Sequence, residues 1–216
     1  MTSSSASSEQ WANIGGREIP YVVERRSVKH PRLEFKTGRL IIILPRGRES
    51  EDSLLERRAG WILKKHSIIE LARERVGKRA SGSDLLVFGR PFPLKRNDER
   101  QFQKHLKRLL KGRIKKTIQH YGARLGVKPG KIFIKKQTTK WGSCSYKGNV
   151  SFNLRLVSLP ERTIRYVVFH EMLHLVEKEH NNSFWETLRG EFSDYERLEK
   201  ELLEYWFFTV NQKYFA

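Results

Sequence analysis

Residues 160–180 constrain the fold most, because they combine a strong helix pattern with three histidines and a glutamate. Pro160-Glu161 is a typical helix start, since proline suits the first helical position and an acid suits the first turn. Apolar residues then recur at helical spacing, at Ile164, Val167, Val168 and Leu175. The pattern predicts a helix with a buried apolar face, and buried polar side chains on it need partners.

His170 and His174 lie four residues apart on this helix, which places both imidazoles on one face, one turn apart. Two neutral imidazole nitrogens on one face can bind a single Zn²⁺ ion. Glu171 follows His170 and can reach a water molecule at the metal without being a ligand itself. This H-E-x-x-H arrangement is typical of metal-dependent hydrolases, in which the glutamate is the general base.

A third histidine, His180, follows ten residues after His170 and is the expected third metal ligand. Metzincins share this spacing, but they have a glycine between the second and third histidines, where this chain has Glu177. They also have a downstream methionine, whereas the only methionines here are Met1 and Met172. The metzincin subclass is therefore disfavoured.

The chain after His180 has the residues of a turn followed by a new helix. Asn181-Asn182 can turn the chain, and Ser183-Phe184-Trp185-Glu186 has the form of a capping box. A gluzincin-like site is the alternative, in which a downstream acid such as Glu186 or Glu191 is the third ligand in place of His180.

Length and composition predict a folded protein of one or two domains, since 216 residues are enough for a substantial core. The single cysteine, Cys144, excludes an internal disulfide framework and fits a reducing compartment. No apolar run approaches the length of a membrane span, so we expect no membrane partner. The Ser-rich start lacks the apolar core of a signal peptide, so we expect residues 1–16 to be a disordered tail and the protein to be cytoplasmic.

The formal charge of +19 is concentrated in the middle of the chain. Residues 101–160 contain 15 Lys and Arg and no Asp or Glu, whereas residues 161–216 have a charge of −4. Within the expected helix 102–125, the basic residues lie largely opposite the apolar stripe. This predicts either a solvated helix face or a contact with nucleic acid or another polyanion, through Lys107, Arg108, Lys111 and Lys115.

Other segments predict a mixed α+β fold. We expect strands at 17–28, 32–45, 131–137 and 149–156, a hairpin at 85–96, and helices at 51–76, 102–125, 183–189 and 194–207. Residues 141–145 read as a loop. The strand 149–156 directly precedes the histidine helix, so we expect it to border the cleft and pair with an extended peptide. Asn153 and Arg155 on it are candidate substrate or oxyanion contacts.

Several motifs together resemble the YgjP-like zinc metallopeptidase family, which is related to the SprT-like and WLM peptidases. The resemblance covers about residues 17–206 and rests on Arg25–Lys29, Leu44-Pro45, Trp61–Lys65, Phe88–Leu94, Trp141–Ser145, Gly148–Val157, Tyr166–Leu175 and His180–Trp185. It implies His170, His174 and His180 as metal ligands and Glu171 as the catalytic acid and base. Some members carry a nucleotide-pyrophosphatase label, so the reaction class stays open.

Together these observations predict an α+β protein of two parts. Residues 17–100 form a β-rich amino-terminal region that includes a long helix, and residues 101–216 form a zincin-like metallopeptidase domain. We expect a zinc-dependent hydrolase with one Zn²⁺ per chain that acts on protein or peptide substrates, and nucleic acid is a further candidate partner through the basic surface. The alternatives are a metal-dependent nucleotide pyrophosphohydrolase and a non-catalytic, basic nucleic-acid-binding module. No Gly-rich phosphate loop supports the nucleotide reading, and an intact Glu171 disfavours the non-catalytic one.

Overall fold

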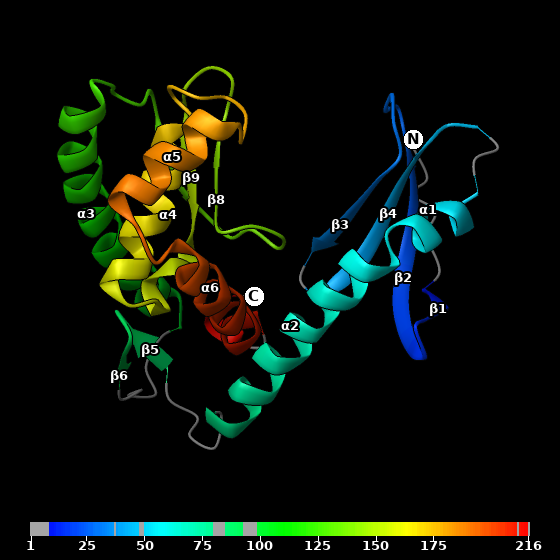
Figure 1. Cartoon of the computed structure of the whole chain (residues 1–216). Helices are drawn as coiled ribbons and strands as arrows, with labels where there is room; N and C mark the ends of the chain where they lie inside the picture. The colour runs from blue at the N-terminus through cyan, green and yellow to red at the C-terminus, as the bar shows by residue number, and fades with distance from the viewer. Residues whose placement is uncertain are drawn as a thin grey trace, which may run out of the picture. The chain divides into compact units, whose positions relative to one another are not determined.

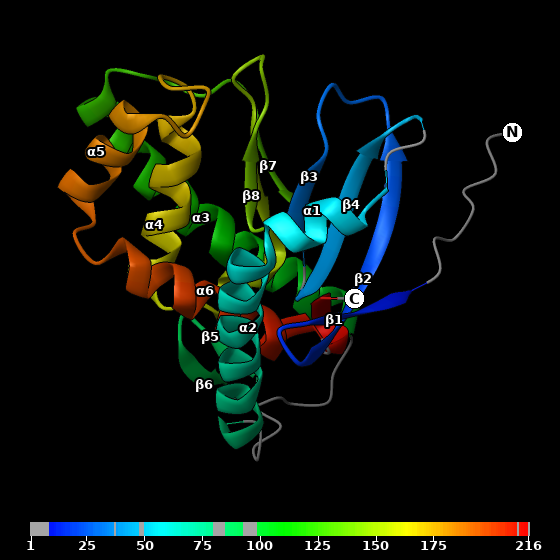
Figure 2. The ribbon, with the colours of Figure 1, turned by 45° about the vertical axis from the view of Figure 1, so that its right-hand side comes forward.

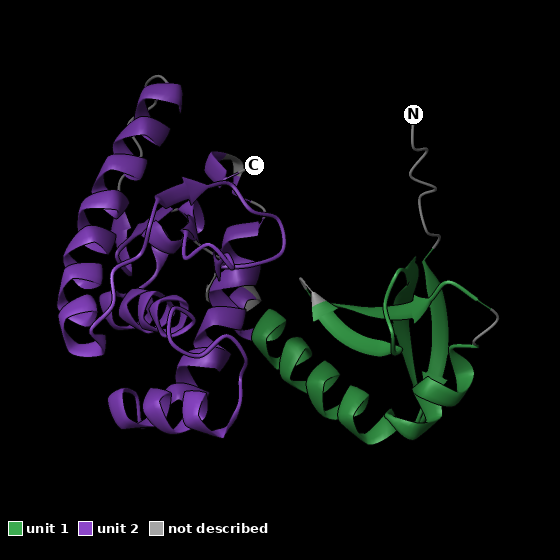
Figure 3. Ribbon diagram, turned by 90° about the horizontal axis from the view of Figure 1, so that it is seen from above, with its two compact units in different colours: residues 1–74 green, residues 75–216 purple. Residues whose placement is uncertain are grey.

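The computed structural model describes residues 9–36, 38–47, 50–79, 85–92, 99–210 and 212–215. The protein has the mixed helix and sheet architecture that the sequence predicts, and its chain divides into two compact units, residues 1–74 and 75–216 (Figure 3). The division falls earlier than the expected boundary near residue 100. Among the helices of these residues, none has both the length and the apolar character needed to cross a membrane.

The first unit is a four-stranded sheet with helices over one face (Figure 2). The strand order is β1-β2-β4-β3, in which β2 and β4 are parallel and the outer pairs are antiparallel. Ile19, Leu40 and Ile42 from the sheet form one core with Leu55 and Ile62 from the helices. The elements are β1 (Gln10–Ile14), β2 (Arg17–Arg26), β3 (Arg32–Lys36), β4 (Arg39–Pro45), α1 (Asp52–Arg57) and α2 (Ala59–Arg79).

Two features of this unit differ from the sequence prediction. Gln10–Ile14, expected within a disordered tail, form β1 and pair with β2 through a two-residue turn. Both turn residues, Gly15 and Gly16, have positive φ, which such a hairpin turn requires and glycine adopts readily. The expected helix 51–76 is broken at Arg58, whose backbone leaves the helical region (φ −109°, ψ 9°). The remainder of the expected tail, residues 1–8, lies outside the described residues.

The second unit packs helices around a three-stranded sheet (Figure 1). Its core contains Tyr121, Phe152, Tyr166 and Phe184, all of which are fully buried. The elements are β5 (Leu85–Val87), β6 (Arg90–Phe92), α3 (Glu99–Leu125), β7 (Ile132–Lys135), β8 (Gly142–Cys144), β9 (Val150–Asn153), the 3-10 helix η1 (Leu154–Ser158), α4 (Glu161–Leu173), α5 (Asn182–Glu191), α6 (Tyr195–Val210) and η2 (Lys213–Phe215).

The β5–β6 hairpin belongs to this second unit, which explains the early division of the chain. Leu85 is buried in the large core, and the backbone N–H of Phe88 donates to the carbonyl of Val157. The turn residues Phe88 and Gly89 both have positive φ. A side chain at Gly89 would also meet Pro160 at 3.1 Å, just before α4 begins.

The sheet of the second unit has the order β7-β9-β8, so the strand expected at the cleft lies in the middle. β9 pairs in parallel with β7 and antiparallel with β8, and all four of its residues are buried. The expected loop 141–145 contains β8, which forms the edge of the sheet beside α4. The prediction that the strand 149–156 pairs with an extended peptide is therefore wrong, because both of its edges are paired within the sheet, and β8 is the edge strand.

Candidate active site

The three predicted histidines converge where α4 ends. His170 lies in the last turn of α4, His174 is its C-cap, and His180 lies in the loop before α5. One ligand atom from each ring lies within 4.8 Å of the others, and the Nε2 atoms of His170 and His180 are 3.0 Å apart. Two nitrogens on a tetrahedral zinc ion are about 3.3 Å apart, so the donors and their spacing fit zinc.

In the structure, His180 lies next to the first two histidines. Neither Glu186 nor Glu191 is part of this group. Among the described residues, this triad is the only group of three potential ligands gathered closely enough to hold a metal ion. Glu191 instead accepts a hydrogen bond from the Tyr121 hydroxyl at 3.0 Å and pairs with Arg124. The gluzincin-like alternative therefore has no geometric support at Glu191.

Burial favours the neutral form of two of the imidazoles, which is the form that binds metal. Burial, with smaller contributions from the neighbouring His174 and His180, lowers the pKa of His170 to about 3. Burial and His174 also lower the pKa of His180. The Nδ1 atom of His174 lies 3.0 Å from the carbonyl oxygen of Glu177, so Nδ1 carries the proton in this hydrogen bond and Nε2 is left for a metal.

Aromatic side chains fix the orientation of the three rings. Phe184, in the first turn of α5, lies with its ring centroid 5.0, 4.9 and 4.6 Å from those of His170, His174 and His180. Trp185 stacks on His180 at 5.6 Å, and its indole N–H donates to the His180 carbonyl at 3.1 Å. The resemblance included this Phe-Trp pair, but the sequence alone did not indicate what it contacts.

Glu171 is buried next to His170, with 8% of its surface exposed. Its carboxylate accepts a hydrogen bond from the backbone N–H of Cys144 on β8. Burial raises the pKa of Glu171 to about 7, against the lowering effects of the Lys140 charge and of that hydrogen bond. A carboxyl group with a pKa near neutrality can both accept and return a proton.

Gly142 on β8 makes room for Glu171, and sequence reasoning did not identify this role. A Cβ atom at position 142 would lie 2.7 Å from both Cγ and Oε1 of Glu171, closer than real Cβ contacts allow. The available signal was the Trp141-Gly142-Ser143-Cys144 motif of the resemblance. Any side chain at this position would displace the Glu171 carboxylate or the strand.

The backbone N–H and C=O groups of β8 point toward β9 and away from it at alternate residues. The Trp141 carbonyl accepts from the Asn153 N–H, and the Ser145 N–H donates to the Asn149 carbonyl. In an antiparallel pair the residues between such positions direct their backbone groups outward. Gly142 and Cys144 are those residues, and the outward N–H of Cys144 is the one that reaches Glu171.

Asn153 and Arg155 differ from one another in their surroundings. The Asn153 amide donates to the Gln137 and Lys140 carbonyls, at 2.8 and 2.9 Å, so both of its N–H groups are used within the protein. Arg155 is buried, and its guanidinium carbon lies 4.9 Å from the ring centroid of Trp206. Burial lowers the pKa of Arg155, and its Nε and Nη1 atoms make no hydrogen bond.

The basic residues of α3 lie at the surface, as the helix pattern predicts. Buried Leu106, Leu110, Ile114, Ile118 and Tyr121 attach the opposite face of α3 to the core. Arg108 also contacts His105, with 3.1 Å between Nη2 and Nδ1. The exposed basic residues of α3 are Arg100, Lys104, Lys107, Arg108, Lys111, Lys115, Lys116 and Arg124.

The mixed fold and the buried glutamate beside three histidines are those of a metallopeptidase, and comparison with known proteins agrees. A family model described as "YgjP-like, metallopeptidase domain" matches residues 94–205. The chain therefore belongs to the YgjP-like family, as its motifs predicted. The match does not extend over residues 17–93, which the resemblance also included.

Two further comparisons complete this result. The crystal structure of the metallopeptidase zymogen of Methanocaldococcus jannaschii jannalysin is 25% identical, covers 52% of this chain and 94% of its own, and has a TM-score of 0.37. No curated protein matches the chain.

Proposed function

We propose that this metallopeptidase is zinc-dependent, that His170, His174 and His180 hold the metal, and that Glu171 is the general base. The supporting observation is the convergence of three imidazoles beside one buried carboxyl group. Zinc, when bound by three protein ligands, supplies a Lewis acid and lowers the pKa of a water molecule toward about 7. A Glu171 carboxylate oxygen takes the proton of the attacking water and returns it to the leaving amine.

The free edge of β8 supports a peptide as the substrate. An extended peptide can add to such an edge through backbone hydrogen bonds. The Cys144 N–H already donates to Glu171, so a peptide would pair with the outward groups of Gly142 and with the Cys144 carbonyl, and it would pass the proposed base. Asn153 and Arg155 stay predicted substrate or oxyanion contacts; the two unpartnered nitrogens of Arg155 are buried.

Metal analysis of the purified protein and its variants tests the ligand set. We expect one zinc per chain, lost when His170, His174 or His180 is replaced by Ala. Glu171→Gln should keep the metal and lose turnover, because the amide cannot accept the proton. Near-full zinc occupancy in the His174→Ala variant would overturn the assignment.

Side-by-side assays of an unfolded protein and of nucleoside triphosphates test the reaction class. We expect peptide-bond cleavage that Glu171→Gln abolishes. Phosphate release that the same variant abolishes, without any proteolysis, would instead establish a nucleotide pyrophosphohydrolase. The two readouts use the same preparation, so a misfolded sample cannot mimic either result.

We also propose that the protein acts near nucleic acid, which the exposed basic face of α3 would contact. Binding through phosphates should tolerate any sequence and weaken steeply with salt. Titration of labelled single- and double-stranded DNA should show tighter binding by the parent than by a Lys107→Glu, Lys111→Glu double variant. The matched control is Lys64→Glu, Lys65→Glu, which changes the net charge equally at two exposed positions of α2. Equal binding by both variants would remove a specific role of α3.

A further inference from the structure

Glu177 lies at the centre of a hydrogen-bond network in the loop that carries His180. Its carboxylate accepts from two side chains, one on each oxygen: Asn181 Nδ2 at 3.0 Å and Ser183 Oγ at 2.9 Å. These two donors lower the pKa of Glu177, which keeps the carboxylate ionised. The three residues bracket His180, which lies between Glu177 and Asn181 in the chain.

The backbone of Glu177 connects the same network to α4. Its N–H donates to the Leu173 carbonyl at 2.8 Å, and its carbonyl accepts from Nδ1 of His174 at 3.0 Å. One residue therefore orients the second histidine through its carbonyl group and holds the loop of the third through its carboxylate. A metzincin has glycine in this place, so this chain makes the turn with a side chain that bonds within the loop.

Asn181 extends the network into α5. Its Oδ1 atom accepts from the Phe184 N–H at 2.9 Å, which makes Asn181 the N-cap in place of the expected Ser183. Phe184 and Trp185 then contact the histidine rings and the His180 carbonyl. The position of His180 is thus fixed on both sides, by Glu177 before it and by the start of α5 after it.

We propose that Glu177 is a positioning residue that holds the His174 ring and the His180 loop in the geometry that binds the metal. This inference rests on the proposed metal site. Without these hydrogen bonds, metal binding would have to order the loop, which costs conformational entropy. Groups that orient metal ligands typically change metal affinity 10–100-fold when they are mutated.

The test is the zinc dissociation constant of metal-depleted protein, measured by competition with a chromophoric chelator. Glu177→Gln keeps the size of the side chain but removes the charge from both hydrogen bonds and leaves one acceptor oxygen for two donors. We expect zinc affinity to fall about 10–100-fold. Glu179→Gln is the matched control, because Glu179 is exposed in the same loop and the change removes the same charge. It should bind zinc as the parent does.

A second variant separates positioning from folding. Ser183→Ala removes the donor to Oε1 alone, so it should weaken zinc binding less than Glu177→Gln, and the double variant should lose less affinity than the two single changes added together, because both act on the same bond. The absorption bands of bound Co²⁺ should change in Glu177→Gln and not in Glu179→Gln. Thermal unfolding of the metal-depleted variants shows whether they are folded.

The outcomes distinguish this inference from the metal site on which it rests. Parent protein that binds zinc, together with Glu177→Gln and Ser183→Ala that bind it equally well, overturns the role of Glu177 and leaves the metal site intact. Parent protein that binds no zinc overturns both. An equal loss of zinc affinity in Glu177→Gln and Glu179→Gln would indicate a general effect of charge and would also overturn the positioning role of Glu177.

Discussion

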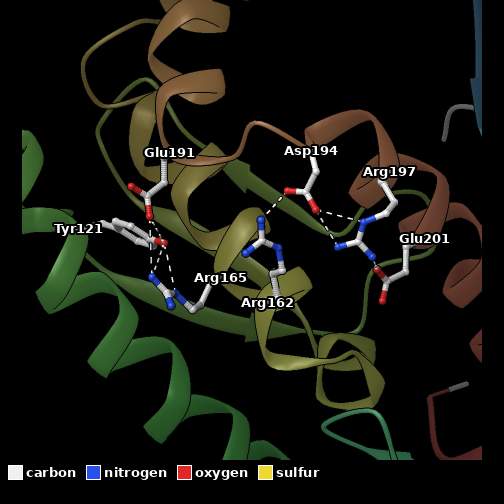
Figure 4. Close-up of polar contacts among 7 residues, drawn as sticks. All are labelled: Tyr121, Arg162, Arg165, Glu191, Asp194, Arg197 and Glu201. Carbon is white, nitrogen blue, oxygen red and sulfur yellow. Dashed lines mark hydrogen bonds and ion pairs between the residues drawn. The ribbon is translucent and has the colours of Figure 1, made fainter.

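The two halves of α4 differ in how their polar side chains are surrounded. In its first half, Arg162 pairs with Asp194, and Arg165 contacts Tyr121 and Glu191 (Figure 4). The charged side chains among them are partly exposed, and Tyr121 is buried. In the second half, His170 and Glu171 are withdrawn from water, and burial shifts both of their pKa values toward the neutral form.

The second half of α4 is less stable than it could be, because it buries ionisable groups that the proposed chemistry needs. Exposed ion pairs contribute little, about 0–1 kcal/mol each, and tolerate replacement because water can solvate either partner. A buried carboxyl group disfavours its charged form, and its neighbours must fit closely around it. Changes near Glu171 should therefore have large effects on activity, whereas changes near Arg162 should have small effects on stability.

The largest expected effect comes from Gly142→Ala on the strand that covers Glu171. The added Cβ would lie 2.7 Å from Oε1 and displace the carboxylate. A displacement of about 1 Å in a catalytic group can cost about 100-fold in rate, so we expect at least that loss in kcat with zinc content unchanged. Ser143→Ala on the same strand is the control. Full activity in Gly142→Ala would show that the strand adjusts.

An intermediate effect is expected in the stability of metal-free Glu171→Gln. Because burial raises the folded-state pKa of Glu171 from 4.5 to about 7, ionisation destabilises the parent as pH rises between these values. The glutamine variant lacks this loss. Its advantage over the parent should appear above about pH 4.5 and grow to about 3 kcal/mol near pH 7. Denaturant unfolding of both metal-free proteins from pH 4 to 8 measures it, and a pH-independent difference contradicts it.

The smallest effect is expected from Asp194→Asn in the exposed half. Hydrogen bonds from Arg162 and Arg197 lower the pKa of Asp194 to about 2. The stability that this carboxylate contributes is present above about pH 4 and is lost as pH falls through about 2. The variant should melt less than about 3 °C below the parent at pH 7, with no change in activity. A larger loss at pH 7 would mean that the ion pairs of this half matter as much as the buried half.

The sequence predicted the helix side of the site well and the strand side poorly. His170, Glu171 and His174 follow from one spacing on one helix, because four residues make about one turn. His180 required only a turn, and Asn181-Asn182 indicated one. By contrast, β8 is the three-residue Gly142-Ser143-Cys144, which has no β-branched or aromatic residue and becomes a strand only by pairing with β9.

The remaining differences have the same origin in tertiary structure. Asn181 replaces Ser183 as the cap because Ser183 Oγ is bonded to Glu177, a contact that no helix-capping rule anticipates. The break at Arg58 has no proline to mark it, and the nearest glycine, Gly60, lies within α2. Gly15-Gly16 is a signal for the turn after β1, but the Ser-rich residues before it favour a prediction of disorder.

Gly142 also bears on how relatives of this protein should be judged. A chain could keep all three histidines and Glu171, bind zinc, and still carry a larger residue where this one has Gly142. Such a chain would retain every hallmark of an enzyme in a motif search and yet be a pseudoenzyme, a metal-binding scaffold without turnover. The lack of a side chain at this one position, rather than the motif alone, would then separate enzymes from pseudoenzymes.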